Sequence, residues 1–127
     1  MSERELALTL LQRTYYDGVD AGDMMRATSA LHEEIEWSHA QVWAHHDFIA
    51  GKPTRMQGRA AIREFLDARR EQLAAAGIRH RLVDLVIDQG RGAFLGEVTG
   101  PDGTTKPFMV WFELRDRLIG RYLLRPL

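Results

Sequence analysis

The order of the expected elements constrains this chain more than any single motif does. Three segments with apolar residues at helical spacing lie in the first part of the chain, and only segments of strand character follow them. Helices followed by consecutive strands are typical of an α+β fold, in which helices cover one face of an antiparallel sheet. We therefore predict one α+β domain over residues 1–127, with three helices of the N-terminal half backing a curved sheet.

The first helix is expected to begin near Glu3. Ser2 and Glu5 fit the capping-box pattern, in which side chains satisfy the free N–H groups at a helix start. Leucines, tyrosine and valine then recur on one helical face. Gly18 and Gly22 mark the end of this helix, because glycine favours helix termini.

Two further helices are expected. Asp23 is well placed to cap a short helix that runs to about His32. The third helix spans about Arg59 to Ala76, and Gly77 is a good C-terminal stop.

The remaining segments are predicted to be strands and turns. Residues 34–40 alternate, with Trp37 and His39 on the same face. Residues 41–56 lack a clean period and are expected to form a long loop, which in a small domain is usually functional or mobile. The second half reads as an antiparallel meander of four strands over residues 79–88, 93–99, 105–114 and 118–124.

Composition limits the classes of function. The chain has 127 residues, a net charge of −1 and no cysteine. It therefore has no disulfide, thiolate nucleophile or cysteine-ligated metal, and its charge gives no reason to expect nucleic acid or an anionic membrane as a partner. No apolar signal segment or run of membrane-spanning length occurs, so we expect a cytoplasmic protein.

Four stretches carry a resemblance to a known family: Tyr15–Asp23, Glu33–Trp37, Gly58–Phe65, and the closing hairpin from Phe112 to Tyr122. Their order and spacing resemble the nuclear transport factor 2-like superfamily, in particular its SnoaL-like and ketosteroid isomerase-like branches. The resemblance implies a cone-shaped, cystatin-like α+β barrel with a largely apolar cavity. It also implies a homodimer built through the outer face of the sheet.

The same resemblance implies candidate catalytic residues. The isomerases of the superfamily use a tyrosine near the end of the first helix as an oxyanion donor, and Tyr15 falls there, with Tyr16 as the alternative one residue on. His39 falls at the position of their general base, and histidine titrates near neutral pH. Their second oxyanion donor, an aspartic acid, falls near Val110. Valine cannot donate a hydrogen bond, so a true ketosteroid isomerase is not expected.

Strand register decides which other side chains enter the cavity. Glu97, Trp111 and Glu113 are expected to face outward, although a slip of one residue would exchange the two faces. Asp20 is interpreted first as a turn and cap residue, and a role as a catalytic acid is the alternative. His80 is expected to lie on the strand surface or at the rim. The expected cavity lining is Tyr16, Trp37, Trp43, Phe65, Val98, Val110, Phe112 and Tyr122.

Each candidate has an alternative reading. His39 could be a buried histidine satisfied by a backbone carbonyl, and Tyr15 a core tyrosine bonded to a neighbouring strand. Residues 45–47, His-His-Asp, suggest a metal site, but their spacing fits no recognised zinc pattern and we expect no metal. Trp43 and Phe48 are instead expected to close over an apolar ligand, or to anchor their loop to the core.

These features predict a protein that binds a small apolar or polycyclic molecule in its cone. We expect cofactor-independent acid–base chemistry there, of the isomerase, dehydratase or cyclase type. The alternative is a non-catalytic ligand-binding or protein-interaction module of the same fold, since an apolar cavity with one histidine suffices to bind.

Overall fold

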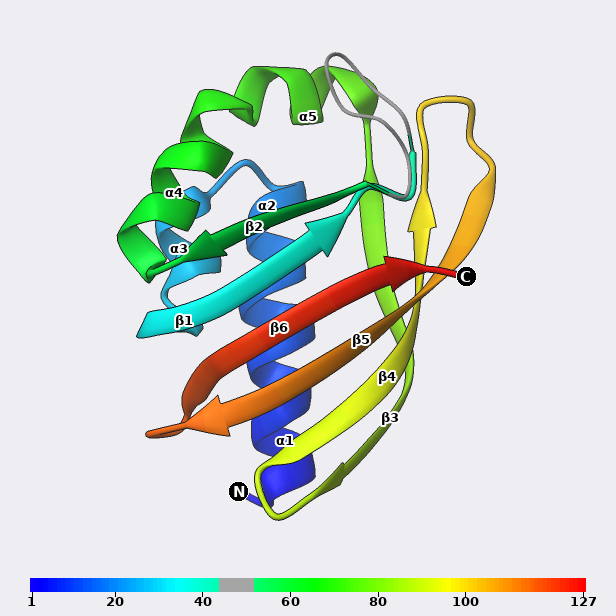
Figure 1. Ribbon diagram of the computed structural model, residues 1–127. Helices are drawn as coiled ribbons and strands as arrows, with labels where there is room; N and C mark the ends of the chain where they lie inside the picture. Colours follow the sequence, from blue (N-terminus) through cyan, green and yellow to red (C-terminus); the bar gives the residue numbers. More distant parts are fainter. Residues whose placement is uncertain (44–51) are drawn as a thin grey trace.

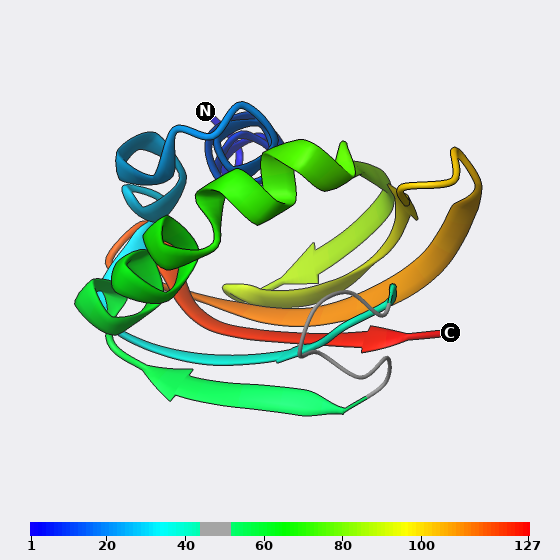
Figure 2. The same ribbon diagram turned by 90° about the horizontal axis from the view of Figure 1, so that it is seen from above.

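The computed structural model describes residues 1–43 and 52–127, and it shows two layers. A six-stranded curved sheet forms one layer, and the helices lie on its concave side (Figures 1 and 2). The predicted α+β class with a curved sheet is confirmed. The strands are β1 (Leu31–Ala40), β2 (Pro53–Gln57), β3 (Arg79–Asp88), β4 (Arg91–Thr99), β5 (Thr105–Arg115) and β6 (Leu118–Pro126).

The sheet has the strand order β2-β1-β6-β5-β4-β3 and is not closed into a barrel. Strands β3 to β6 form the predicted antiparallel meander. Two features differ from the expectation. The pairing of β1 with β6 is parallel, because the chain crosses over between them. The segment expected to be one long loop contains β2, an edge strand that pairs with β1. The irregular hydrophobic pattern of this segment gave no sign of a strand.

The first helical segment is continuous from Glu3 to Asp20 but changes its winding. It comprises α1 (Glu3–Leu8), a π-helical stretch η1 (Thr9–Tyr16) and α2 (Asp17–Asp20). Ser2 caps it as predicted, since its hydroxyl accepts a hydrogen bond from the Glu5 N–H at 3.1 Å.

Gly18 does not end this helix, as the sequence suggested, but lies buried inside α2. A Cβ atom at this position would lie 2.8 Å from the backbone of Ala27, so glycine lets α2 and α3 (Met24–Thr28) approach closely. Asp23 caps α3 as predicted, but α3 ends before His32 because β1 has already begun there.

The predicted third helix is interrupted at Arg69, which has the non-helical angles φ −109° and ψ 3°. Two helices result, α4 (Arg59–Ala68) and α5 (Arg70–Ala76). Gly77 ends α5 in the left-handed conformation, with φ 64°, as expected. Within the described ranges, no helix is both long and apolar enough to cross a membrane.

Strand β5 separates a buried face from an outer face. Phe108, Val110 and Phe112 are buried, whereas Trp111 is 38% exposed. On the outer face, Glu113 accepts hydrogen bonds from the Trp111 indole at 2.9 Å and from Arg121 at 3.2 Å. The outward orientation expected for Trp111 and Glu113 therefore holds. Glu97 also lies outside, where it pairs with Arg81.

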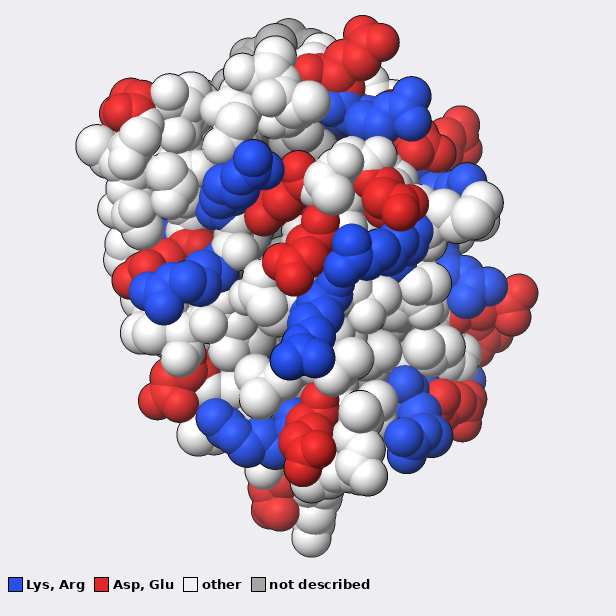
Figure 3. Space-filling model, turned by 180° about the vertical axis from the view of Figure 1, so that it is seen from behind, with Lys and Arg blue, Asp and Glu red and all other residues white. Residues whose placement is uncertain are grey.

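The opposite side of the molecule carries intermixed charges rather than a field of one sign. Figure 3 shows arginine and lysine side chains alternating with acidic ones across the side seen from behind. An exposed pair of this kind is Arg63 with Asp67, one turn apart on α4 with an N–O distance of 3.6 Å. Intermixed signs fit the net charge of −1, and this side shows no continuous positive field that would attract a polyanion.

Candidate functional site

A cavity of about 60 Å³ lies between the concave face of the sheet and the helices. Apolar and aromatic side chains make up most of its wall, and the polar groups are few. Such a setting suits the binding of a small organic molecule, oriented by a limited number of hydrogen bonds. Among the predicted residues, those that line the cavity are Tyr15, Tyr16, Trp37, His39, Trp43, Phe65, Val98 and Tyr122.

Two residues that were predicted to line the cavity, Val110 and Phe112, are not part of its described wall. Both point to the concave side, but they are 1% and 0% exposed and belong to the packed core. Phe112 packs against Phe94, with ring centroids 6.1 Å apart. The inward register was therefore correct, but the aromatic side chains of β4 and β5 fill this part of the cone.

Three tyrosines converge on the cavity. The Tyr15 hydroxyl accepts a hydrogen bond from the Trp37 indole N–H at 3.2 Å. The hydroxyls of Tyr16 and Tyr122 lie 2.6 Å apart, so one donates to the other. The rings of Tyr15 and Tyr122 touch edge to face, with centroids 5.4 Å apart. Tyr15 and Tyr16 are consecutive residues of η1, both are buried, and their ring centroids lie 5.4 Å apart.

Once the Trp37 indole N–H is counted, this cluster has more hydrogen-bond donors than acceptor oxygens. A phenol has one O–H donor and an oxygen that also accepts. Tyr15 uses its oxygen to accept from Trp37, and its own hydrogen meets no acceptor among the described residues. Within the pair of Tyr16 and Tyr122, one hydrogen is used and the other meets no described acceptor. Two buried O–H donors therefore remain for a ligand oxygen.

The three phenols stay protonated at neutral pH. Burial raises the pKa of Tyr15, and the hydrogen bond from Trp37 offsets this only in part. Burial also raises the pKa of Tyr16 and of Tyr122 well above the usual value of a tyrosine. All three are neutral donors in this pH range.

Asp20 and His80 form a pair beside the tyrosines. Asp20 Oδ1 lies 2.7 Å from His80 Nδ1, and Asp20 Oδ2 accepts from the His80 backbone N–H at 2.7 Å. The His80 ring stacks on Tyr16, with centroids 5.0 Å apart and planes 8° apart. The sequence reading placed His80 on the strand surface or rim. In the structure, His80 lines the cavity. A carboxylate on Nδ1 fixes the tautomer and leaves Nε2 as a base.

His39 lies in the cavity wall at the end of β1. Its ring stacks on Trp37, with centroids 5.3 Å apart, and its Nδ1 lies 3.3 Å from the Gln41 side-chain amide. Trp37 therefore contacts both predicted catalytic residues, with its indole N–H on Tyr15 and its ring face on His39. The two residues share one cavity but reach it from different sides of this tryptophan.

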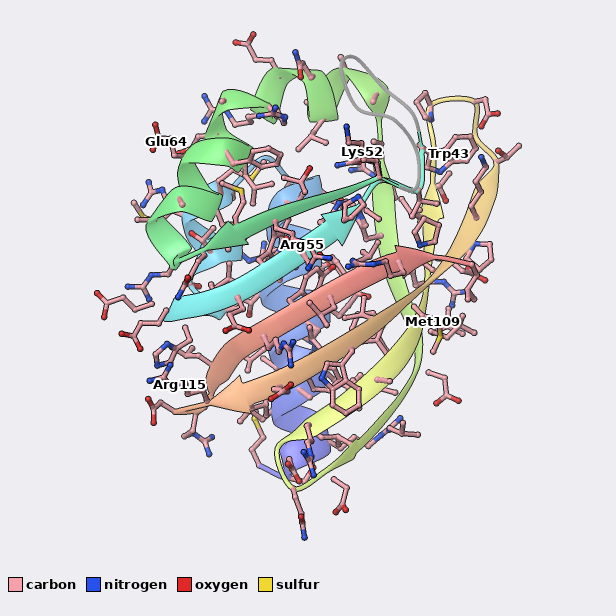
Figure 4. All side chains as sticks on the ribbon, in the orientation of Figure 1. Trp43, Lys52, Arg55, Glu64, Met109 and Arg115 are labelled. Atoms are coloured by element: carbon pink, nitrogen blue, oxygen red, sulfur yellow. The ribbon has the colours of Figure 1, made fainter. Side chains whose placement is uncertain are left out.

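Trp43 lies beside the connection of β4 and β5 (Figure 4). Its indole N–H donates to the Val98 carbonyl at 3.3 Å, and the Lys106 ammonium lies 4.0 Å from the ring centroid. A Cβ atom on Gly100 would lie 2.3 Å from the Trp43 ring. These contacts hold the tryptophan at the rim of the cavity. Phe48 and the His-His-Asp run at residues 45–47 lie outside the described residues.

Arg69 brings a positive charge to the wall of the cavity. It occupies the break between α4 and α5, and its guanidinium carbon lies 3.9 Å above the Phe65 ring. Among the described residues, no group of three potential metal ligands is present.

Sequence reasoning missed the pairing of Asp20 with His80, although a signal existed. In β3, positions 80 and 82 are more buried than 79 and 81, so strand alternation turns His80 inward. Asp20 follows the two tyrosines at the end of the first helix, and its partner is sixty residues away in sequence. Only the packing of α2 against β3 brings the two together.

The curved sheet, the helices on its concave side and the cavity between them define a protein of the nuclear transport factor 2-like class. Within this class, the SnoaL-like domain family matches residues 12–122, and the chain belongs to that family. None of the curated protein sequences matches the chain.

Solved structures with low sequence identity share the fold. TerC, co-crystallised with polyporic acid, superposes with a TM-score of 0.69 at 19% identity, over 98% of this chain and 90% of that one. A putative polyketide cyclase from Xanthomonas campestris pv. campestris gives 0.62 at 21% identity, over 97% and 91%. A putative ketosteroid isomerase from Kribbella flavida DSM 17836 gives 0.65 at 19%, over 94% and 76%.

Proposed function

We propose that the protein is a cofactor-independent acid–base enzyme that transfers a proton next to a carbonyl group of a cyclic, mostly apolar ligand. The observation that carries this proposal is the donor excess in the tyrosine cluster. Two buried phenolic O–H groups lack described acceptors, and an enolate or carbonyl oxygen would satisfy them.

Each group has a role in the proposed reaction. His80 takes a proton from the carbon next to the carbonyl, and the electron pair of the broken C–H bond moves onto the carbonyl oxygen. Tyr15 donates a hydrogen bond to this oxygen, together with Tyr16 or Tyr122. Asp20 accepts from His80 Nδ1 and stabilises the imidazolium. Return of the proton to another carbon gives isomerisation. If the His80 imidazolium instead gives this proton to a β-hydroxyl group, the C–O bond breaks, water leaves and the product is dehydrated.

His39 is the second candidate base. It lies in the same cavity wall and is linked to Tyr15 through Trp37. We place His80 first, because the Asp20 carboxylate lies 2.7 Å from its Nδ1 and orients the ring.

The size of the cavity favours a small ligand. A volume of about 60 Å³ holds a few water molecules, whereas sites for drug-sized ligands are several times larger. A single-ring ketone therefore requires less rearrangement than the polycyclic ligand considered from the sequence. A two-ring ligand requires a rim side chain such as Trp43 to move.

The proposal can be tested without knowing the natural substrate. Cyclohexanone and 2-tetralone carry exchangeable hydrogens next to the carbonyl, and their replacement by deuterium in D2O can be followed by NMR. We expect the protein to accelerate this exchange. We also expect His80→Gln and Tyr15→Phe each to reduce the acceleration by about a hundredfold, the usual effect of losing a base or an oxyanion donor.

The matched control is His32→Gln. His32 bonds to Asp116 at 3.1 Å and does not line the cavity, so this variant should retain full activity. Variants at His39 decide between the two bases: a larger loss in folded His39→Gln than in His80→Gln makes His39 the base. The proposal is wrong if folded wild-type protein binds the ketones and leaves their exchange rate unchanged.

That last result would support the alternative, a non-catalytic ligand-binding module. The packing of Val110 favours it, because no carboxylic acid stands at that position to act as a second oxyanion donor.

We also propose that the protein forms a homodimer through the outer sheet face, where Trp111 and Met109 of β5 are each 38% exposed. Sedimentation of Trp111→Lys against wild type tests the dimer, since a charge in the interface should shift it to the monomer.

A further inference from the structure

His80 borders a second cavity in addition to the one described above. This outer cavity has a volume of about 200 Å³ and lies where α2, α5 and β3 meet. Figure 1 shows the end of α5, the end of α2 and the start of β3 at the same end of the molecule. Val19, Leu73, Ile78 and His80 line both cavities, so these four residues form the partition between them.

Asp20 lines only the outer cavity. His80 therefore borders both cavities, and its partner Asp20 borders the outer one. The only titratable member of the partition is His80, because the other three are apolar. Its Nδ1 lies 2.7 Å from Asp20 Oδ1, which is close enough for direct proton transfer.

The surroundings of this pair are charged on the outer side and aromatic on the inner side. Arg79 of β3 donates to the Asp20 carbonyl at 3.1 Å and lines the outer cavity. Asp17 of α2 is engaged by Gln12, which also donates to the His80 carbonyl. On η1, Tyr16 covers the face of the His80 ring.

We propose that the outer cavity is a proton port, through which His80 exchanges protons with bulk water by way of Asp20. The Nδ1–H bond of the imidazolium breaks and an O–H bond forms on Asp20. Asp20 then passes the proton to a water molecule in the outer cavity, which becomes hydronium, and the reverse sequence loads the ring. His80 can therefore lose or regain its Nδ1 proton while a ligand fills the inner cavity. This role deepens the proposed acid–base function and rests on it for its purpose.

Filling the port tests the proposal. Ala74 lines the outer cavity from α5 and is exposed, so Ala74→Phe should narrow it without disturbing the core. The matched control is Ala75→Phe, at the next residue of the same helix, which is also exposed and lines neither cavity. The measurement is the exchange rate of the His80 Nδ1 proton with water, by NMR on protein labelled with ¹⁵N at histidine and without any ketone.

We expect exchange at His80 to slow about tenfold or more in Ala74→Phe and to stay at the wild-type rate in Ala75→Phe. Asp20→Asn is the second variant: it keeps an oxygen that can accept from Nδ1 but cannot carry the proton onward, so exchange should slow there too. Wild-type exchange rates in both folded Ala74→Phe and folded Asp20→Asn would overturn the port. Because no ketone is present, this outcome is independent of whether the protein catalyses ketone exchange.

Discussion

The tyrosine cluster predicts how the protein responds to alkaline pH. All three tyrosines of the chain are buried in it, and burial raises the pKa of each. Above the ordinary tyrosine value of about 10, the unfolded chain loses these protons while the folded chain keeps them. The stability that they contribute is therefore complete below about pH 10 and is lost as the pH rises above it.

The size of this effect follows from the number of groups. Each tyrosine that stays protonated in the folded state lowers the free energy of unfolding by about 1.4 kcal/mol for every pH unit above its unfolded pKa. Three such groups remove about 4 kcal/mol by pH 11 and about 8 kcal/mol by pH 12. Domains have a total stability of about 5–15 kcal/mol, so the loss by pH 12 equals the whole stability of a domain in the lower part of this range. We therefore expect unfolding at or above about pH 12.

Two signals recorded on the same alkaline titration test this reasoning. Tyrosinate absorbance and far-UV circular dichroism should change together, in one steep transition, because the tyrosines ionise only when the fold opens. Tyr122→Phe is the control: its stability should fall less steeply with pH, by about one third of the wild-type slope. Tyrosinate formation near pH 10 with an unchanged circular dichroism spectrum would refute the argument.

Three further predictions concern local packing. Gly18→Ala should lower the free energy of unfolding by about 2 kcal/mol in urea titrations, because the clash with the Ala27 backbone outweighs the gain in helix propensity. An increase in the free energy of unfolding would show that Gly18 has no packing role. Gly100→Ala should displace the Trp43 ring, seen as greater acrylamide quenching of tryptophan fluorescence, and unchanged quenching would contradict this. Ser2→Ala should lower the free energy of unfolding by about 1 kcal/mol. An unchanged free energy of unfolding would mean that the Ser2 cap contributes nothing to stability.

The parts of the fold that were predictable are those set by local sequence. Ser2, Asp23 and Gly77 occupy the helix caps that their residue types indicate, and β3 spans the predicted residues. The misplaced features depend on distant neighbours. Gly18 serves a close approach of two helices rather than a helix end, and that role is invisible without the position of Ala27.

The candidate site divides in the same way. Tyr15 and His39 could be placed in the cavity because they lie on elements with a clear period or a family resemblance. Asp20 and His80 could not be paired, since their contact joins a helix end to a strand sixty residues later. Phe112 was assigned to the correct face but the wrong depth, because alternation fixes the side of a sheet and not how far the core extends.

The position of β6 in the sheet has a consequence for the order of folding. β6 follows the other five described strands in sequence, yet it lies between β1 and β5 and joins the pair β2-β1 to the meander. During synthesis, β1 and β2 are complete long before the only strand that connects them to the rest of the sheet. Pairings across so many residues close slowly. Before residue 126 has emerged, β1 and β2 can pack against α4 but cannot join the meander. The cavity wall is complete only when Tyr122 and Leu124 of β6 have docked.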